Sequence, residues 1–192
     1  MTSIQAPAIQ ELISRLDEAV AVRDDAACCR RVKQVLTDVI GRGERFLDAA
    51  FLRPAPDRYA RRLIHRDPAG RYSILAMVWD KGQGTGLHDH AGIWCVECVY
   101  EGRIRVTSYS VRGGDPERDL VIFEQESVVT AGVGEAGALI PPFEYHRLIN
   151  PDDTPAVTLH VYGAEMTHCH VYEPEPDGRY RRTYRELSYT ES

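Results

Sequence analysis

The spacing of apolar residues changes near residue 59, and this change constrains the fold more than any other feature of the sequence. Before it, apolar residues recur at helical spacing, at Ile9, Leu12, Ile13, Leu16 and Val20, and again at Val32, Val35, Leu36, Val39 and Ile40. After it, short runs rich in Val, Ile, Tyr and Thr alternate with turns made of Gly, Pro and Asp. The sequence therefore predicts a helical segment over residues 1–52 followed by a β-rich part.

The β-rich part predicts a barrel or jelly roll, because many short strands with frequent turn signals are typical of such folds. We expect strands at 59–65, 72–79, 86–90, 94–100, 103–111, 120–126, 127–131, 138–140, 146–150, 158–162 and 168–172. Residues 173–192 are polar, and we expect them to form a surface arm packed on the barrel.

Length and charge narrow the class of protein. A chain of 192 residues suits one domain with its own core, so we expect a single α+β, mainly β, domain with a helical part (1–52), a barrel (59–172) and an arm (173–192). The net charge is -6 and no basic cluster is present, which argues against nucleic acid as a partner. The chain contains neither a membrane-length apolar run nor a signal-peptide pattern, so we expect a cytoplasmic protein with no membrane partner.

The pair His88 and His90 is the first candidate for a functional site. Residues two apart on a strand share a face, so both imidazoles can point into one cavity. Neutral imidazole is a ligand for iron, zinc, copper or nickel. The spacing of Gly82, His88, His90, Cys95 and Gly102 resembles the first metal motif of the cupin family, in which the position of Cys95 is commonly a glutamate.

A second segment, residues 141–150, resembles the second cupin motif. It keeps the proline, His146 and Asn150, although Phe143 stands where the common pattern has glycine. The resemblance implies a cupin-type β-barrel (jelly roll) in which His88, His90 and His146 surround one metal ion. Cys95 and Cys98 have the spacing of half a zinc site, but no second such pair exists in the sequence.

A narrower resemblance covers roughly residues 59 to 172. Together with the three histidines it is carried by Tyr59-Ala60-Arg61, Trp79, Cys95 and Thr158-Leu159-His160-Val161-Tyr162. This set is similar to the thiol dioxygenase family, specifically to cysteine dioxygenases, and the flanking segments resemble bacterial members. The resemblance implies Fe(II) as cofactor, L-cysteine and dioxygen as substrates, and cysteine sulfinic acid as product. Three neutral histidines would leave the metal its full charge, which favours an anionic ligand such as a thiolate.

The resemblance assigns substrate binding to the first strand. Arg61 matches the arginine that binds the substrate carboxylate, and Tyr59 shares its face of the strand. A guanidinium can hold a carboxylate through two parallel hydrogen bonds. Arg62 would then lie on the opposite face, where we expect it to be solvated. The alternative is that Arg61 is one of several surface arginines between Arg53 and Arg66.

The resemblance also assigns a relay to one later strand. Thr158, His160 and Tyr162 match the Ser-His-Tyr relay of the family, with threonine replacing serine, and period two places them on one face. A half-buried strand without a site would show the same alternation. Cys95 matches the cysteine that forms a thioether with the tyrosine in mammalian cysteine dioxygenases, so a Cys95–Tyr162 crosslink is a hypothesis. A small buried residue is the alternative for Cys95.

Two other functions stay open. A 3-mercaptopropionate dioxygenase shares the histidines and the relay but tends to have glutamine at the position of Arg61, so Arg61 favours cysteine. A non-enzymatic cupin that binds a metal or a small ligand would need neither Arg61 nor the relay. A second metal site at Cys169 is disfavoured, because alternation directs His168 and His170 away from it. Whether the two tryptophans line the cavity or pack in the core is left open.

Overall fold

The computed structural model of the chain describes residues 7–116, 120–142 and 144–191, so Phe143 lies outside the described residues. Helices α1 (Pro7–Ala19) and α2 (Asp25–Gly41) and the short helix η1 (Ala49–Leu52) come first, as expected. The strands are β1 (Ala60–Arg66), β2 (Ser73–Trp79), β3 (Leu87–His88), β4 (Cys95–Glu101), β5 (Ile104–Gly114), β6 (Leu120–Ala131), β7 (Ala136–Leu139), β8 (Tyr145–Ile149), β9 (Ala156–Tyr162), β10 (His168–Pro174) and β11 (Tyr180–Glu186). Within the described ranges, no helix is long and apolar enough to cross a membrane.

The strands form two sheets. A five-stranded sheet has the order β1-β2-β9-β4-β7, and a six-stranded sheet has the order β10-β11-β6-β5-β8-β3. The second sheet closes on itself, because β3 pairs with both β8 and β10. Leu75 and Cys95 from the first sheet share one buried core with Ile104 and Leu148 from the second. This shared core between two antiparallel sheets confirms the expected jelly roll.

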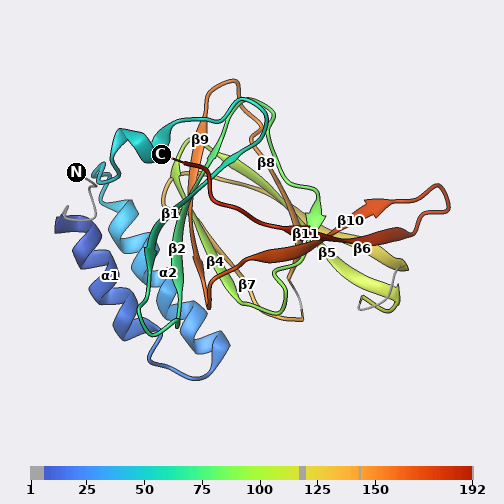
Figure 1. Cartoon of the computed structure of the whole chain (residues 1–192), viewed down its shortest axis with the longest axis horizontal. Helices are drawn as coiled ribbons and strands as arrows, with labels where there is room; N and C mark the ends of the chain where they lie inside the picture. Colours follow the sequence, from blue (N-terminus) through green and yellow to red (C-terminus); the bar gives the residue numbers. More distant parts are fainter. Residues whose placement is uncertain (1–6, 117–119, 143, 192) are drawn as a thin grey trace.

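The two long helices cover the outer face of the five-stranded sheet (Figure 1). Leu12 of α1 and Leu36 of α2 are fully buried in a cluster with Ile74 of β2 and Val161 of β9. The central strands β2 and β9 are therefore buried at every position, on one face by helices and on the other by the barrel core. Burial on both faces explains their nearly continuous apolar sequences, because a half-solvated strand would alternate with polar residues.

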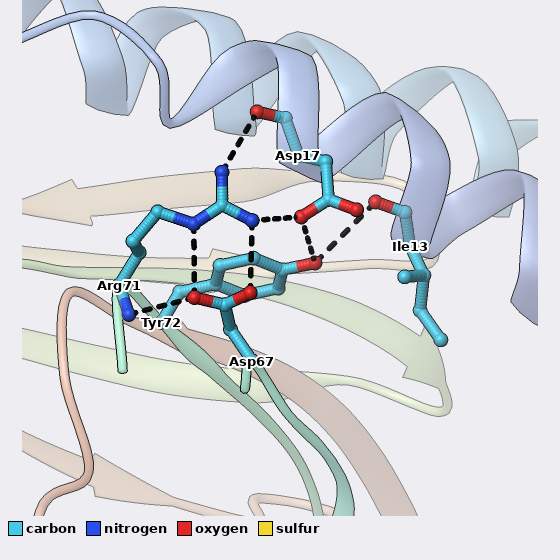
Figure 2. A network of polar contacts seen from close by, with 5 residues as sticks. All are labelled: Ile13, Asp17, Asp67, Arg71 and Tyr72. Carbon is cyan, nitrogen blue, oxygen red and sulfur yellow. Dashed lines mark hydrogen bonds and ion pairs between the residues drawn. The ribbon is translucent and has the colours of Figure 1, made fainter. Parts of the chain in front are cut away.

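A polar network fastens α1 to the turn between β1 and β2 (Figure 2). Arg71 donates hydrogen bonds to both carboxylate oxygens of Asp67, at 2.9 and 2.8 Å, and pairs with Asp17 on α1. The Tyr72 hydroxyl lies 3.3 Å from Asp17 Oδ1 and 3.4 Å from the carbonyl oxygen of Ile13. The Arg71 guanidinium holds the pKa of Asp67 at about 2, so this carboxylate is ionised in the folded protein at neutral pH.

Part of the segment expected to be a polar surface arm forms a strand of the barrel sheet. Strand β10 continues to Pro174, and β11 pairs with β10 along its whole length and with β6 at Tyr180 and Arg181. The segment is polar because β11 exposes much of its surface at the rim of the barrel. The two strands expected at 120–126 and 127–131 are one strand, β6, in which Glu126 is skipped in the pairing with β5. A bulge at this residue explains the break in the apolar pattern.

The expectation that Arg62 is solvated is wrong. Arg62 does lie on the opposite strand face from Arg61, but only 4% of its surface is exposed. Ala60 and Ile64, two residues before and after it on β1, are buried in the core cluster that includes residues of α1 and α2. Its Nε and Nη1 atoms have no hydrogen-bond partner within the described ranges. Burial lowers the pKa of Arg62, and the charge of Arg53 adds to this effect.

Candidate metal centre

The three histidines predicted as ligands lie together in the barrel. His88 on β3 pairs directly with His146 on β8, and His90 follows in the loop after β3. The ring centroids are 4.6 Å apart for His88 and His146, 4.9 Å for His90 and His146, and 5.2 Å for His88 and His90. One ligand atom from each histidine lies within 4.8 Å of the other two. This arrangement can hold a single metal ion.

The protonation states of the triad suit metal binding. Burial is the largest cause that lowers the pKa of each histidine, so all three imidazoles are neutral at physiological pH. His88 Nδ1 lies 3.1 Å from the carbonyl oxygen of Gly86, which can only accept, so His88 keeps its proton on Nδ1 and a lone pair on Nε2. His90 Nδ1 and both nitrogens of His146 have no hydrogen-bond partner among the residues described. Buried nitrogens without partners are costly, and a metal ion would satisfy one on each ring.

The three residues predicted to form a relay contact one another in series, and Trp79 adds a fourth member to the series. Trp79 Nε1 donates to Thr158 Oγ1 at 2.9 Å, and Thr158 Oγ1 lies 2.8 Å from His160 Nε2. Thr158 Oγ1 therefore accepts from the indole and shares a second hydrogen bond with His160 Nε2. The Tyr162 hydroxyl lies 3.4 Å from His160 Nδ1. Trp79, Thr158, His160 and Tyr162 thus form one continuous chain of polar contacts.

Burial fixes the charge of the relay. It lowers the pKa of His160 to about 3, with a further contribution from the positive charge of Arg61. It also raises the pKa of Tyr162 well above the ordinary value, with a further contribution from Cys95. At neutral pH the imidazole is therefore uncharged and the phenol keeps its proton. The phenolic O–H is then free to donate into the cavity that contains the histidines.

Arg61 lies on the wall of the same cavity as the triad, a small enclosed space of about 20 Å³. Its guanidinium is buried, with Nη2 donating to the carbonyl oxygen of Met166 at 2.7 Å and the ring of Tyr189 at 5.1 Å from Cζ. Its Nη1 has no hydrogen-bond partner in the described part of the chain. Tyr59 also lines the cavity and stacks on Trp79 at 4.6 Å. A buried cation with an unused donor suits an anionic ligand group.

Cys95 and Tyr162 are direct cross-strand partners on β4 and β9, and both are buried. The Cys95 sulfur lies 3.8 Å from His160 Nδ1, beside the phenol. Cys169 lines the cavity, whereas His168 and His170 lie on the other face of β10, near the ring of Tyr184. The triad is the one metal-capable histidine, cysteine and carboxylate cluster found among the described residues.

Trp79, whose place in the cavity or the core was open from the sequence, lines the cavity and donates to Thr158. Two residues near the centre were not predicted from the sequence. Tyr189 covers Arg61 from the segment expected to be an arm. Glu97 is only 6% exposed, and its carboxylate oxygens lie 3.9 Å from His146 Nδ1 and 3.7 Å from His160 Nδ1. Burial raises the pKa of Glu97 to about 8. The available signal was its position two residues after Cys95, which places it on the same inward face.

Comparisons with known proteins find related sequences and structures. A sequence profile described as cysteine dioxygenase type I matches residues 2–175. Cysteine dioxygenase type 1 of Homo sapiens is 25% identical over 117 residues, and that of Danio rerio is 24% identical over 122 residues. Both matches cover 60% of this chain and 56% of the relative, so the chain spans little more than half the length of these curated relatives. A solved cupin protein from Desulfovibrio desulfuricans has a TM-score of 0.45 at 18% identity, covering 62% of this chain and 94% of that one.

Proposed function

The chain belongs to the cysteine dioxygenase type I family, and on this premise we propose that it is a non-haem iron thiol dioxygenase that converts L-cysteine and dioxygen to cysteine sulfinic acid. The observation that carries the proposal is one small cavity lined both by three neutral histidines and by a buried arginine with an unused donor. A metal site beside an anion site fits a substrate that carries a thiolate at one end and a carboxylate at the other.

Each residue of the cavity has a proposed role. His88, His90 and His146 hold Fe(II), which when bound would supply positions for the thiolate and for dioxygen. Arg61 binds the substrate carboxylate through Nη1, while the carbonyl oxygen of Met166 holds Nη2 in place. The Tyr162 hydroxyl would donate a hydrogen bond into the cavity, and His160, 3.4 Å away through Nδ1, holds the phenol in position.

The size of the cavity supports a small substrate. Its volume of about 20 Å³ is that of about one or two water molecules, so even a compact thiol requires wall side chains such as Met77, Leu148 and Leu187 to move. A peptide or a glutathione-sized molecule would require a much larger movement. The same walls exclude bulk water, which strengthens the interaction between Arg61 and a carboxylate.

A Cys95–Tyr162 thioether is proposed as a modification of the same centre. The direct cross-strand pairing of the two buried residues supports this modification. A carbon–sulfur bond would form as the S–H of Cys95 and one ring C–H of Tyr162 are lost, with dioxygen as the oxidant that takes up both hydrogens. The crosslink would fix the phenol in the position that the relay requires.

Two alternatives are separated by one experiment. The iron-loaded protein is supplied with L-cysteine or with 3-mercaptopropionate, oxygen uptake is followed, and sulfinate is detected by mass spectrometry with isotopically labelled dioxygen. The zinc-loaded protein serves as the control. Sulfinate from cysteine with both oxygen atoms labelled is the expected result. Preference for 3-mercaptopropionate would contradict the substrate, and metal binding without uptake of oxygen would favour a non-enzymatic cupin.

A further inference from the structure

Glu97 lies close to both the triad and the relay. It lies on β4 of the five-stranded sheet, whereas His146 lies on β8 of the other sheet. Its cross-strand partners are His160 on β9 and Gly137 on β7, and the glycine has no side chain to compete for the space. Glu97 Oε1 lies 3.9 Å from His146 Nδ1, and Oε2 has no hydrogen-bond partner in the ranges described.

Glu97 is not a member of the group of ligand atoms. That group contains only the three histidines, and the carboxylate approaches the triad from the Nδ1 side of His146. His146 would therefore bind a metal through Nε2 and present Nδ1–H to the carboxylate. A metal-bound histidine generally donates its second N–H to a carboxylate or carbonyl, which fixes the tautomer and the orientation of the ring. His88 already has such an acceptor in the carbonyl oxygen of Gly86, and Glu97 is the group in position to serve His146.

We propose that Glu97 is a positioning residue of the metal centre, whose carboxyl group accepts a hydrogen bond from His146 Nδ1 behind the three-histidine site. Many cupins place a glutamate on the metal at the position of Cys95. Here the acidic residue lies two positions further along β4 and would contact a ligand rather than the metal, so iron would keep three protein ligands and its open positions.

The structure leaves room for the adjustment that this hydrogen bond needs. A hydrogen bond spans about 2.7–3.2 Å, so the gap must close by about 1 Å. Glu97 faces a second cavity of about 320 Å³ with mainly apolar walls, including Val99, Val106 and Val129. Its side chain can change rotamer in this space without displacing the backbone of β4.

The proposal rests on the metal centre of the proposed function but not on its thiol chemistry, so metal affinity without substrate tests it. Co(II) is titrated by visible absorption against a competing chelator into the wild type, Glu97→Gln and Glu97→Leu. Loss of an outer partner of this kind costs about 10- to 100-fold in metal affinity. We expect a loss in that range for Glu97→Leu and a smaller one for Glu97→Gln, because the amide oxygen of glutamine can still accept the hydrogen bond from His146 Nδ1 and leucine cannot.

Glu135→Gln is the matched control, because Glu135 lines the same cavity but its carboxylate accepts from the backbone N–H of Gly132 at 2.6 Å. It should bind Co(II) as the wild type does. The Fe(III)/Fe(II) midpoint potential provides a second measurement and should become more positive in Glu97→Leu. A Co(II) affinity unchanged in both Glu97 variants would overturn the proposal. The affinity would also be unchanged if Glu97 acted only on His160, and the proposal would then be wrong as well. Absence of Co(II) binding by the wild type would instead contradict the proposed metal centre itself.

Discussion

Replacing Arg61 with glutamine tests whether this residue binds the carboxylate of the substrate. In the structure one guanidinium nitrogen is held by the carbonyl oxygen of Met166, and Nη1 is left for the ligand. The contact at stake is therefore one charge-assisted hydrogen bond in a buried site, worth about 1.5–3 kcal/mol. By the usual conversion, Arg61→Gln should lower kcat/KM for L-cysteine by about 10- to 140-fold.

The assay compares thiols with and without the carboxylate. The sulfinic acid product is measured with L-cysteine and with cysteamine as substrate. Cysteamine has the same thiol and amine but no carboxylate. Cysteamine should be a poor substrate for the wild type and should lose little further activity in Arg61→Gln. Arg61→Lys keeps the positive charge but lacks the planar pair of donors. Its kcat/KM for L-cysteine should therefore lie between those of the wild type and Arg61→Gln. An equal loss for both thiols would refute the reasoning, because Arg61 would then act on the fold or on the metal site.

Three further predictions concern other parts of the structure. Asp67→Asn should lower the free energy of unfolding by about 1–2 kcal/mol at neutral pH, a figure discounted because Arg71 is partly exposed. Since the folded pKa of Asp67 is depressed to about 2, the difference from the wild type in urea unfolding should be present above the unfolded pKa and vanish as the pH falls through about 4 to 2. Tyr189→Ala removes the ring over Arg61 and should raise KM for L-cysteine by about 2- to 30-fold, whereas Tyr189→Phe should resemble the wild type. The intact mass of active protein should be lower than the sequence mass by two hydrogen atoms, and Cys95→Ala should abolish this difference; an unmodified mass in fully active enzyme would exclude the thioether.

The positions of the site residues could be predicted because alternation along a strand fixes which side chains share a face. His88 with His90, and Thr158 with His160 and Tyr162, follow this rule and meet in the barrel as expected. The sequence also determines that Arg61 and Arg62 face opposite ways. It does not determine that helices cover the outer face, and for that reason Arg62 is buried rather than solvated.

The features that were missed depend on contacts between distant segments. Strand β11 has a polar sequence and obtains its place by pairing with β10 and β6, so local composition gave no signal for it. Tyr189 reaches Arg61 only because Thr190 hydrogen-bonds to the backbone of β1, with its amide N–H 2.7 Å from the carbonyl oxygen of Arg61. Glu97 was visible as an inward-facing residue, but its approach to His146 depends on how the two sheets face each other.

The proposed roles divide cleanly between the two sheets. His88, His90 and His146 belong to the sheet of β3 and β8 or its adjoining loop, whereas Arg61 and the relay belong to β1 and β9 of the opposite sheet. A thiol bound both at the metal and at Arg61 would therefore connect the two sheets, which the metal alone does not connect. Amide hydrogen exchange should register this division: metal should slow exchange in β3 and β8, and the thiol should extend the protection to β1 and β9. Substrate binding would thus stiffen the barrel as a whole, and the protein would be most rigid when dioxygen arrives.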